Sequence, residues 1–318
     1  MTASDREFDV VVLGGINTDF VVRGRELPGP GASRDGLAFL QGPGGKGANA
    51  AVAAARLGAR VAIIGRVGDD DRGRLLLAGL ADQGVNVACV TIDEERPTGA
   101  AVIQVDASGQ KQILAALGAN LQLTVEDIDA AEKIIRSSRV LLMQLEVPIE
   151  CVATAARIAD SAAMRVMIDP APPRPLPDEL ITMTDVIRAN AGEIEQLTGV
   201  PVRDRTSARQ AARVLLARGV AVVIVATQGG NLLVTDTGET WLPELLVNRV
   251  DETGAGDAFS AAFAVALAEG QSLPDSGRFA SAAAALATAT LGAQTGLPQR
   301  QELQAYLDRV APVMANSR

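Results

Sequence analysis

The chain contains no histidine. This absence removes the commonest general base of enzymes and the usual zinc ligand, and it excludes Ser-His and Cys-His nucleophile pairs. The two cysteines, Cys89 and Cys151, are too far apart for a zinc knuckle and too few for a disulfide framework, so we expect both to be buried apolar residues. Any acid–base chemistry must therefore use Asp, Glu or Lys.

Aromatic residues, positive charge and long apolar runs are also scarce. Aromatic side chains make up 3% of the 318 residues, and the formal net charge is −9. Basic clusters with interleaved aromatic residues are missing, so we expect neither nucleic acid nor an anionic membrane as a partner. No apolar run reaches the roughly 18 residues that span a bilayer, and no signal peptide is recognisable, which predicts a cytoplasmic protein.

Apolar strands alternate with helical segments along most of the chain. Residues 9–15, "DVVVLGG", form a continuous apolar run that is typical of a strand buried on both faces. Helical segments follow such runs, as at 47–57 and 124–138, and Thr124 with Asp127 has the spacing of a capping box. This alternation predicts a single α/β domain over 1–318, with a doubly wound, mostly parallel sheet and helices on both faces.

Two segments, about 17–41 and 98–117, interrupt this rhythm. In each, short β-prone runs flank a turn that contains glycine, as in a hairpin. Because both follow the carboxyl ends of core strands, where open α/β sheets bind ligands, we predict a small β-sheet lid over the site. The edges of such a sheet could be covered by a second subunit, so we also expect a homodimer through the lid.

The standard nucleotide signatures are missing. The stretch "GPGGKGAN" (42–49) is not a P-loop, because Leu40 stands where the first glycine is required and Gly47 follows Lys46 in place of a hydroxyl residue. The first strand is not followed by a dinucleotide-binding fingerprint, which argues against an NAD-dependent oxidoreductase. The glycine-rich turn that remains opens a helix, and it is compatible either with an anion site or with a plain helix start.

A second glycine-rich helix start, "TGAGDAF" (253–259), carries a carboxylate. Thr253 can cap the helix, while the amides of Gly254, Ala255 and Gly256 and the helix dipole favour a bound anion. Asp257 in the first turn is compatible with a simple helix cap. A carboxylate beside an amide cradle is also what phosphoryl transfer requires, because the amides stabilise the transferred group and the carboxylate accepts the proton of an attacking hydroxyl.

Several motifs occur together and in order: "GGINTD", "GGKGANAAVAAARLGA", "VGDD", "LLMQLE", "NAGEIEQLTG", "DETGAGDAF" and "GAQ". Over nearly its whole length the chain thereby resembles the ribokinase (PfkB) family of carbohydrate kinases. The resemblance implies transfer of the γ-phosphoryl group of Mg·ATP to the 5-hydroxyl of D-ribose, giving ribose 5-phosphate and ADP. The alternatives are another acceptor, namely fructose, a keto-deoxy sugar acid or a nucleoside, and a non-catalytic sensor of sugar or nucleotide.

The resemblance also implies roles for individual residues. Asp257 would be the catalytic base, and the amides of Gly254, Ala255 and Gly256 would form the anion hole. The implied sugar-binding residues are Asn17, Asp19, Gly45, Lys46, Asn49, Glu146 and Asp257. The implied nucleotide-binding residues are Asn190, Glu193, Thr227, Gly229, Gly256 and Ser281.

Metal binding is implied at two places. Glu193 would act on Mg²⁺ through water, although Asn190 and Glu193 are equally compatible with a helix N-cap. A loop that binds a monovalent cation such as K⁺, mainly through backbone carbonyls, would contain Asp251, Thr253, Ala287, Thr290, Gly292 and Gly296. The chain departs from the family at Asn231, near the last glycine of the nucleotide loop, and at Gly296, which lacks a common hydroxyl. The adenine contacts and potassium activation are therefore left open.

Overall fold

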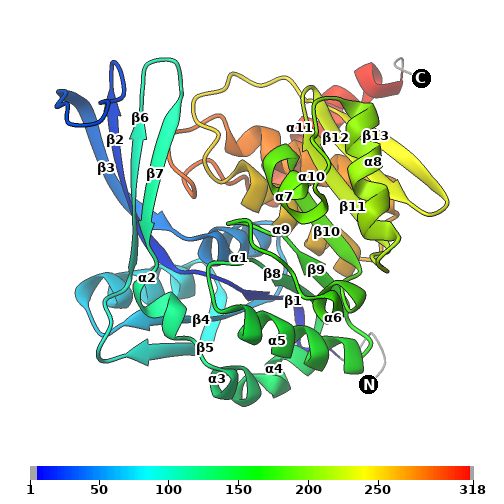
Figure 1. The fold of residues 1–318 in the computed structure, drawn as a ribbon, viewed down its shortest axis with the longest axis horizontal. Helices are drawn as coiled ribbons and strands as arrows, with labels where there is room; N and C mark the ends of the chain where they lie inside the picture. Colours follow the sequence, from blue (N-terminus) through cyan, green and yellow to red (C-terminus); the bar gives the residue numbers. More distant parts are fainter. Residues whose placement is uncertain (1–5, 316–318) are drawn as a thin grey trace.

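The computed structural model describes residues 6–315. Strands from along this part of the chain form one nine-stranded sheet (Figure 1). The strand order is β13-β12-β11-β10-β9-β8-β1-β4-β5, parallel from β5 to β11 and antiparallel at β12 and β13. The strands are β1 (Phe8–Leu13), β4 (Val61–Gly68), β5 (Val85–Asp93), β8 (Ser138–Met143), β9 (Arg165–Ile168), β10 (Val186–Asn190), β11 (Val222–Thr227), β12 (Gly230–Thr235) and β13 (Gly238–Pro243). The predicted mostly parallel sheet is confirmed.

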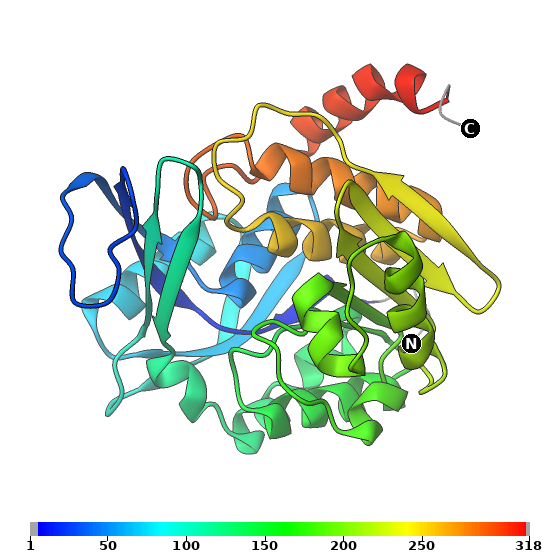
Figure 2. The same cartoon turned by 45° about the horizontal axis from the view of Figure 1, so that its top comes forward.

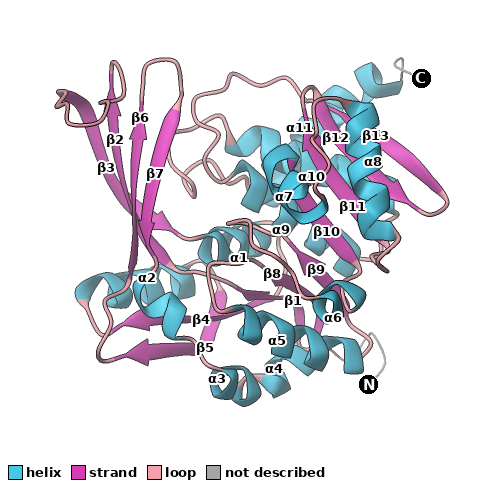
Figure 3. Ribbon diagram, in the orientation of Figure 1, coloured by secondary structure: helices cyan, strands magenta, loops and turns pink. Residues whose placement is uncertain are grey.

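Helices cover both faces of this sheet, as Figure 3 shows. Side chains of successive strand residues point to opposite faces, so strands that are apolar throughout need helices to cover both faces. In β1, Val10 and Val12 belong to one apolar cluster, and Val11 and Leu13 belong to the other. The first cluster packs against α1 (Lys46–Arg56), α2 (Asp71–Asp82), α9 (Ala255–Ala268), α10 (Leu273–Ala287) and α11 (Arg300–Ala315). The second packs against α3 (Val125–Ala130), α4 (Glu132–Arg136), α5 (Ile149–Ser161), α6 (Asp178–Thr182), α7 (Ala191–Thr198) and α8 (Arg205–Leu216).

A second, four-stranded sheet, here called the small sheet, stands to one side of these layers (Figures 1 and 2). Its order is β3 (Gly36–Gly44), β2 (Asn17–Gly24), β6 (Gly99–Val105) and β7 (Lys111–Ala116). Two antiparallel hairpins are joined by the parallel pair β2 and β6. The predicted small sheet is therefore confirmed, and the parallel pairing in its middle is an additional feature.

A loop over 244–254 arches from β13 toward the small sheet, and both Figure 1 and Figure 2 show it in yellow between that sheet and the helices. At its end, Lys111 Nζ on β7 lies 3.5 Å from Thr253 Oγ1. The small sheet thus touches the segment that leads into α9. None of the helices within 6–315 has both the length and the apolarity needed to cross a membrane.

Three local features differ from the sequence-based expectations. The helix expected over 124–138 is divided at Ala131 into α3 and α4, although the capping box of Thr124 with Asp127 is present. The hairpin of β12 and β13 was not predicted. Cys151 is buried as expected, whereas Cys89 is only half-buried because it lies on β5 at the edge of the sheet.

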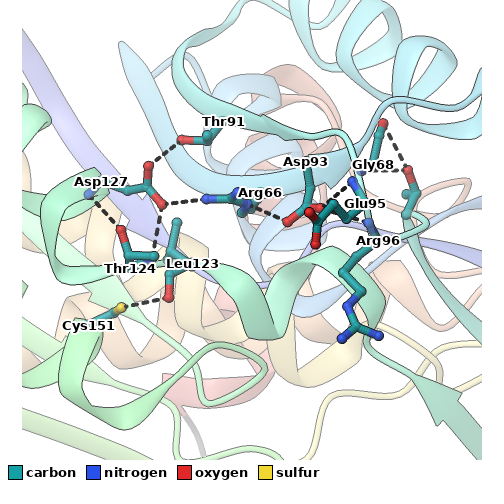
Figure 4. Close-up of polar contacts among 11 residues, drawn as sticks. Arg66, Gly68, Thr91, Asp93, Glu95, Arg96, Leu123, Thr124, Asp127 and Cys151 are labelled. Carbon is teal, nitrogen blue, oxygen red and sulfur yellow. Dashed lines mark hydrogen bonds and ion pairs between the residues drawn. The ribbon is translucent and has the colours of Figure 1, made fainter.

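A polar network fixes the base of the small sheet (Figure 4). Arg66 of β4 donates from Nε to Asp93 Oδ2 (2.9 Å) and from Nη1 to Asp127 Oδ2 (3.0 Å). Thr91 Oγ1 donates to Asp127 Oδ1 at 2.9 Å, and Asp93 Oδ1 accepts the amide of Arg96 at 2.7 Å. The network therefore joins β4, β5 and α3 and holds the turn that leads into β6.

Candidate active site

A cavity of about 660 Å³ opens at the carboxyl ends of the parallel strands, and the small sheet lines one of its sides. The chain proceeds from β1 to β4 and β5 in one direction and from β8 to β11 in the other, so β1 and β8 flank a topological switch point. Ligands bind at such points in open α/β sheets. The cavity collects the predicted residues Asn17, Asp19, Gly45, Lys46, Asn49, Glu146, Asn190, Glu193, Thr227, Gly229, Thr253, Gly254, Ala255, Gly256, Asp257 and Ser281.

The glycine turn before α1 permits a close approach of main chains. Gly45 has φ of 88°, and a Cβ atom there would lie 2.6 Å from the carbonyl oxygen of Gly15. A Cβ atom on Gly44 would lie 2.1 Å from Cγ of Asp19. Only glycine at these positions lets the start of α1 reach the cavity, where the amide of Lys46 donates to Glu146 Oε2 at 2.7 Å.

Amide and carboxylate groups line the end of the cavity nearest β1 and β8. Asn17 Nδ2 donates to Glu146 Oε1 at 3.3 Å. Asn120, which the sequence analysis did not identify, donates from Nδ2 to Asn17 Oδ1 (2.8 Å) and accepts the amide of Ile16 (2.8 Å). Asn120 therefore fixes which way the Asn17 amide points. Such paired donors and acceptors suit a small ligand with several hydroxyl groups.

Asp257 lies in the first turn of α9 and is 6% exposed. Asn49 Nδ2 donates to Asp257 Oδ2 at 2.8 Å, and Gln294 Nε2 orients Asn49 by donating to its Oδ1 at 3.1 Å. Lys46 Nζ lies 3.9 Å from Asp257 Oδ1. Burial raises the pKa of Asp257, whereas Lys46 and the Asn49 hydrogen bond favour the ionised carboxylate. The carboxylate is thus held in place and remains able to accept a proton.

Three carboxylates share this end of the cavity with one ammonium group. Burial raises the pKa of Asp19 to about 7, and the charges of Glu146 and Asp257 add to that effect. Burial also raises the pKa of Glu146, and Lys46 opposes it. The charge of Asp257 in turn raises the pKa of Lys46. A neutral, hydroxylated ligand fits these surroundings better than an anionic one.

The first turn of α9 presents the amides of Gly256 and Asp257, which have no acceptor among the described residues. Gly254 is the N-cap with φ of 81°, and a Cβ atom there would lie 2.6 Å from the carbonyl oxygen of Ala293. The amide of Ala255 donates to the Glu252 carbonyl at 3.3 Å. The amides of Gly256 and Asp257 belong to the first helical turn, where the helix supplies no acceptor. Together with the helix dipole they provide a place for an anion.

The prediction that Thr253 caps α9 is wrong. Its Oγ1 donates instead to Asp251 Oδ1 at 2.7 Å, because the left-handed Gly254 occupies the N-cap position. Asp251 Oδ2 accepts the amide of Gly292 at 2.9 Å, so Asp251 holds two loops together. Of the residues predicted for a monovalent-cation loop, only Thr253 lines the cavity. The others lie outside its lining, namely Asp251, Ala287, Thr290, Gly292 and Gly296.

Gly296 packs directly against the end of α10. A Cβ atom on Gly296 would lie 2.2 Å from the carbonyl oxygen of Ala287, which leaves no room for a side chain at this position. The missing hydroxyl at Gly296 thus has a steric reason. Thr290 is exposed at a separate surface hollow.

Two charged residues that the sequence analysis missed also line the cavity. Asp169 follows β9, and its Oδ2 accepts from Ser260 Oγ at 2.7 Å. Arg188 is on β10, with Nη1 3.4 Å from the same oxygen. Their signals in the sequence were an acidic residue at the carboxyl end of a strand and a cation inside an apolar strand.

The cavity also contains a pair of carboxylates, Asp169 and Glu193, that suits a divalent cation. Glu193 forms a capping box with Asn190, and its pKa is raised by burial and then by the charge of Asp169. Within 6–315 no group of three or more His, Cys, Asp or Glu side chains is arranged to hold a metal. Magnesium keeps several water ligands and binds substrate phosphates, so two carboxylates beside an anion site fit Mg²⁺ bound together with a phosphate ligand.

The far end of the cavity, at β11 and β12, offers unpaired polar atoms. Thr227 ends β11, and Gly229 has φ of 82° in the turn that follows. Asn231 Oδ1 and Ser281 Oγ are buried without a hydrogen-bond partner among the described residues, and both residues line the cavity. A ligand with polar groups, such as a nucleoside, would satisfy these atoms.

Residues 7–300 match the family model described as pfkB family carbohydrate kinase. Ribokinase from Haemophilus influenzae is 38% identical over 300 residues, which cover 94% of this chain and 98% of the relative. Deoxyribokinase from Salmonella typhi is 34% identical over 301 residues, which cover 94% of this chain and 98% of the relative. The structure of Arabidopsis thaliana ribokinase complexed with ribose and ATP superposes with a TM-score of 0.86 at 32% identity, covering 94% of this chain and 98% of that chain. The chain thus belongs to the pfkB family of carbohydrate kinases.

Proposed function

We propose that the protein is an ATP-dependent kinase that transfers the γ-phosphoryl group of Mg·ATP to the 5-hydroxyl of D-ribose. The observation that carries this proposal is Asp257, a buried carboxylate that lies beside free helix amides and is hydrogen-bonded to Asn49. Ribokinases among the relatives, with 38% identity for the one from Haemophilus influenzae, support ribose as the acceptor.

In this proposal the ribose hydroxyls replace water around Asn17, Asp19, Lys46, Asn49 and Glu146. The reacting hydroxyl then lies next to Asp257, which accepts its proton as the oxygen attacks the γ-phosphorus. The amides of Gly254, Ala255 and Gly256 stabilise the charge of the transferring group, although Ala255 must exchange its weak bond to Glu252 for the phosphate.

We further propose that the chain works as one domain whose small sheet, over about 17–41 and 98–117, is the lid. The contact of Lys111 with Thr253 supports this role, since it joins the sheet to the start of α9. Closure over the sugar would exclude water and limit hydrolysis of ATP.

The nucleotide is proposed to lie along Asn190, Thr227, Gly229 and Ser281, with its phosphates at the start of α9. Glu193, through water, and the nearby carboxylate of Asp169 would help to hold Mg²⁺, which would offset the negative charge of the phosphates. The two loops held by Asp251 are proposed to bind K⁺ through backbone carbonyls.

The lining of the cavity favours a sugar over the alternative acceptors. Phe20 and Phe39 stack on each other with ring centroids 6.4 Å apart, but neither lines the cavity. The face of the small sheet that lines the cavity therefore offers a nucleobase no aromatic platform. The inner face of the small sheet carries Ala101, Ile103, Ile113 and Ala115. A sugar acid would place its carboxylate near Asp19, Glu146 and Asp257.

We also propose a homodimer formed through the outer face of the small sheet. Phe39 is 65% exposed and Leu114 is 79% exposed, and Val102 beside Leu114 is 43% exposed. An apolar face of this kind is typical of a surface covered by a partner. A second copy of the same face would cover it with twofold symmetry.

A coupled assay of ADP release tests the function. The panel contains D-ribose, 2-deoxyribose, fructose, a keto-deoxy sugar acid and adenosine, each with Mg·ATP. We expect D-ribose to give the highest kcat/KM. Turnover of 2-deoxyribose or another acceptor above ribose would overturn the assignment of the acceptor, and ADP release that does not depend on any acceptor would overturn the kinase assignment.

A further inference from the structure

Arg188 has no role in the function proposed so far, although its position is unusual. It belongs to β10, which lies between β9 and β11 and whose residues Val186, Ile187 and Ala189 are part of the core. Its side chain is 12% exposed and lines the cavity. Arginine is rarely buried without a partner or a function.

The surroundings of Arg188 fix its direction but satisfy few of its donors. Its Cζ atom lies 5.3 Å from the centroid of the Phe259 ring. Its Nη1 contacts Asp169 Oδ2 at the long distance of 3.4 Å, and that oxygen also accepts from Ser260 at 2.7 Å. Nε is buried without a partner among the described residues. A guanidinium group has five N–H donors, so most of them are available to a ligand in the cavity.

The guanidinium group lies beside the anion site of α9. A Cβ atom on Gly256 would be 2.7 Å from Arg188 Nη1. The free donors of Arg188 and the first-turn amides of Gly256 and Asp257 therefore converge on the same part of the cavity. Glycine at 256 leaves room for this approach.

We propose that Arg188 binds the γ-phosphoryl group of ATP and stabilises it during transfer, an inference that rests on the proposed kinase function. The acceptor oxygen forms a bond to the γ-phosphorus, and the bond from phosphorus to the β,γ-bridging oxygen breaks with its electron pair left on ADP. The acceptor proton goes to Asp257, and Arg188 keeps its protons.

The chemistry of the guanidinium group suits this task. Its planar fork matches two oxygens of a phosphoryl group, and it carries a positive charge. Charge in the transition state is spread over the three equatorial phosphoryl oxygens. Because Phe259 and Asp169 already orient Arg188, little ordering is needed when the phosphate arrives.

A different explanation is that Arg188 only balances the charge of Asp169. The two explanations predict different results in a background where Asp169 is neutral. If Arg188 acts only on Asp169, then replacing Arg188 in the Asp169→Asn variant leaves kcat unchanged. If Arg188 binds the phosphoryl group, its replacement lowers kcat both in wild type and in Asp169→Asn.

The experiment compares Arg188→Met and Arg188→Lys with wild type, using the acceptor that wild type phosphorylates fastest. Methionine keeps an unbranched side chain over Phe259 and removes the charge. We expect Arg188→Met to lower kcat about 100-fold, as for loss of one preorganised donor, with little change in the affinity for the sugar. Arg188→Lys should recover part of kcat, because it restores the charge without the fork.

Aluminium fluoride provides a second measurement, since with ADP and sugar it imitates the phosphoryl group in transfer. Wild type should bind ADP more tightly when aluminium fluoride is present, and Arg188→Met should lose that increase while ADP alone binds as before. Arg66→Met is the control, because Arg66 is likewise a partly buried arginine paired with aspartate, in its case with both Asp93 and Asp127, but lies in the network at the base of the small sheet (Figure 4). It should keep the increase.

Two results would overturn the inference. One is a kcat for Arg188→Met within about threefold of wild type; the other is a measurable kcat for Asp169→Asn that does not fall further in Asp169→Asn/Arg188→Met. Neither depends on the identity of the acceptor, so a failure of ribose as a substrate would count against the proposed function and leave this test intact.

Discussion

Replacement of Asp19 by Asn should make the protein more stable at high pH. Asp19 is 8% exposed, and its pKa rises from 3.8 to about 7 because of burial and of the neighbouring Glu146 and Asp257 charges. The folded state therefore holds a proton that the unfolded state releases above about pH 4. Stability from this group is present at low pH and is lost as the pH rises from about 4 to 7.

The size of the effect follows from the two pKa values. Each unit of pKa difference corresponds to about 1.4 kcal/mol, so the full penalty of ionising Asp19 in the folded state is about 4 kcal/mol at pH 8. Glu146 and Asp257 titrate together with Asp19 and share part of this penalty. We therefore expect the gain in unfolding free energy of Asp19→Asn over wild type to be about 3 kcal/mol larger at pH 8 than at pH 4.

Urea unfolding at several pH values between about 3 and 8 measures this difference. Asp70→Asn is a control of opposite sign. Partial burial would raise the pKa of Asp70, but hydrogen bonds from Gly73 and Thr98 lower it below its usual range. Asp70→Asn should thus destabilise the protein, with a cost that is fully present at pH 8 and shrinks below about pH 4. If Asp19→Asn and wild type show the same dependence of stability on pH, the account of Asp19 is refuted.

Gly45→Ala should lower the free energy of unfolding by more than about 3 kcal/mol, because the backbone there is left-handed and the new Cβ would lie 2.6 Å from a carbonyl oxygen. Gly58→Ala is the control, since Gly58 has φ of 87° but open space around it, and urea unfolding should show a loss of only about 1 kcal/mol. Light scattering should give about twice the chain mass of 32.8 kDa. Leu114→Glu should give monomers, and Leu246→Glu, on a residue 92% exposed outside the small sheet, should not; a monomeric wild type would reject the dimer. Arg66→Met should lower the unfolding free energy by about 2 to 3 kcal/mol, because it leaves two partly buried carboxylates unpaired, and a loss under 0.5 kcal/mol would contradict this. Replacement of K⁺ by Na⁺ should lower kcat, and equal rates in both salts would argue against the cation loop.

Much of the fold could be predicted because its signals are local. Continuous apolar runs such as 9–15 predict strands of a parallel sheet, and the capping box at Thr124 marks a helix start wherever the chain goes next. The parallel pairing of β2 with β6 joins residues that are about eighty positions apart and leaves no local trace. The hairpin of β12 and β13 is not predicted, because Gly229, just before β12, also fits a nucleotide loop.

The candidate site was predictable where one motif contains both the turn and the side chain. Asp257 and its glycines are such a case, and so is Lys46 in its glycine turn. Asn120, Asp169 and Arg188 were missed because none of them lies in a motif with its own turn, and only the folded chain brings Asn120 to Asn17 and Arg188 to Asp169. Side-chain capping at Thr253 was predicted wrongly, since the left-handed backbone of Gly254 decides the N-cap.

The central claim is that Asp257 is the base of a kinase that phosphorylates D-ribose. It is tested most directly by kcat for wild type and Asp257→Asn with D-ribose and Mg·ATP, together with calorimetric ribose affinity of the same preparations. We predict turnover by wild type and a loss of about 10²- to 10⁴-fold in the variant, with ribose affinity changed by less than about tenfold. A variant within about threefold of the wild-type rate would contradict the claim.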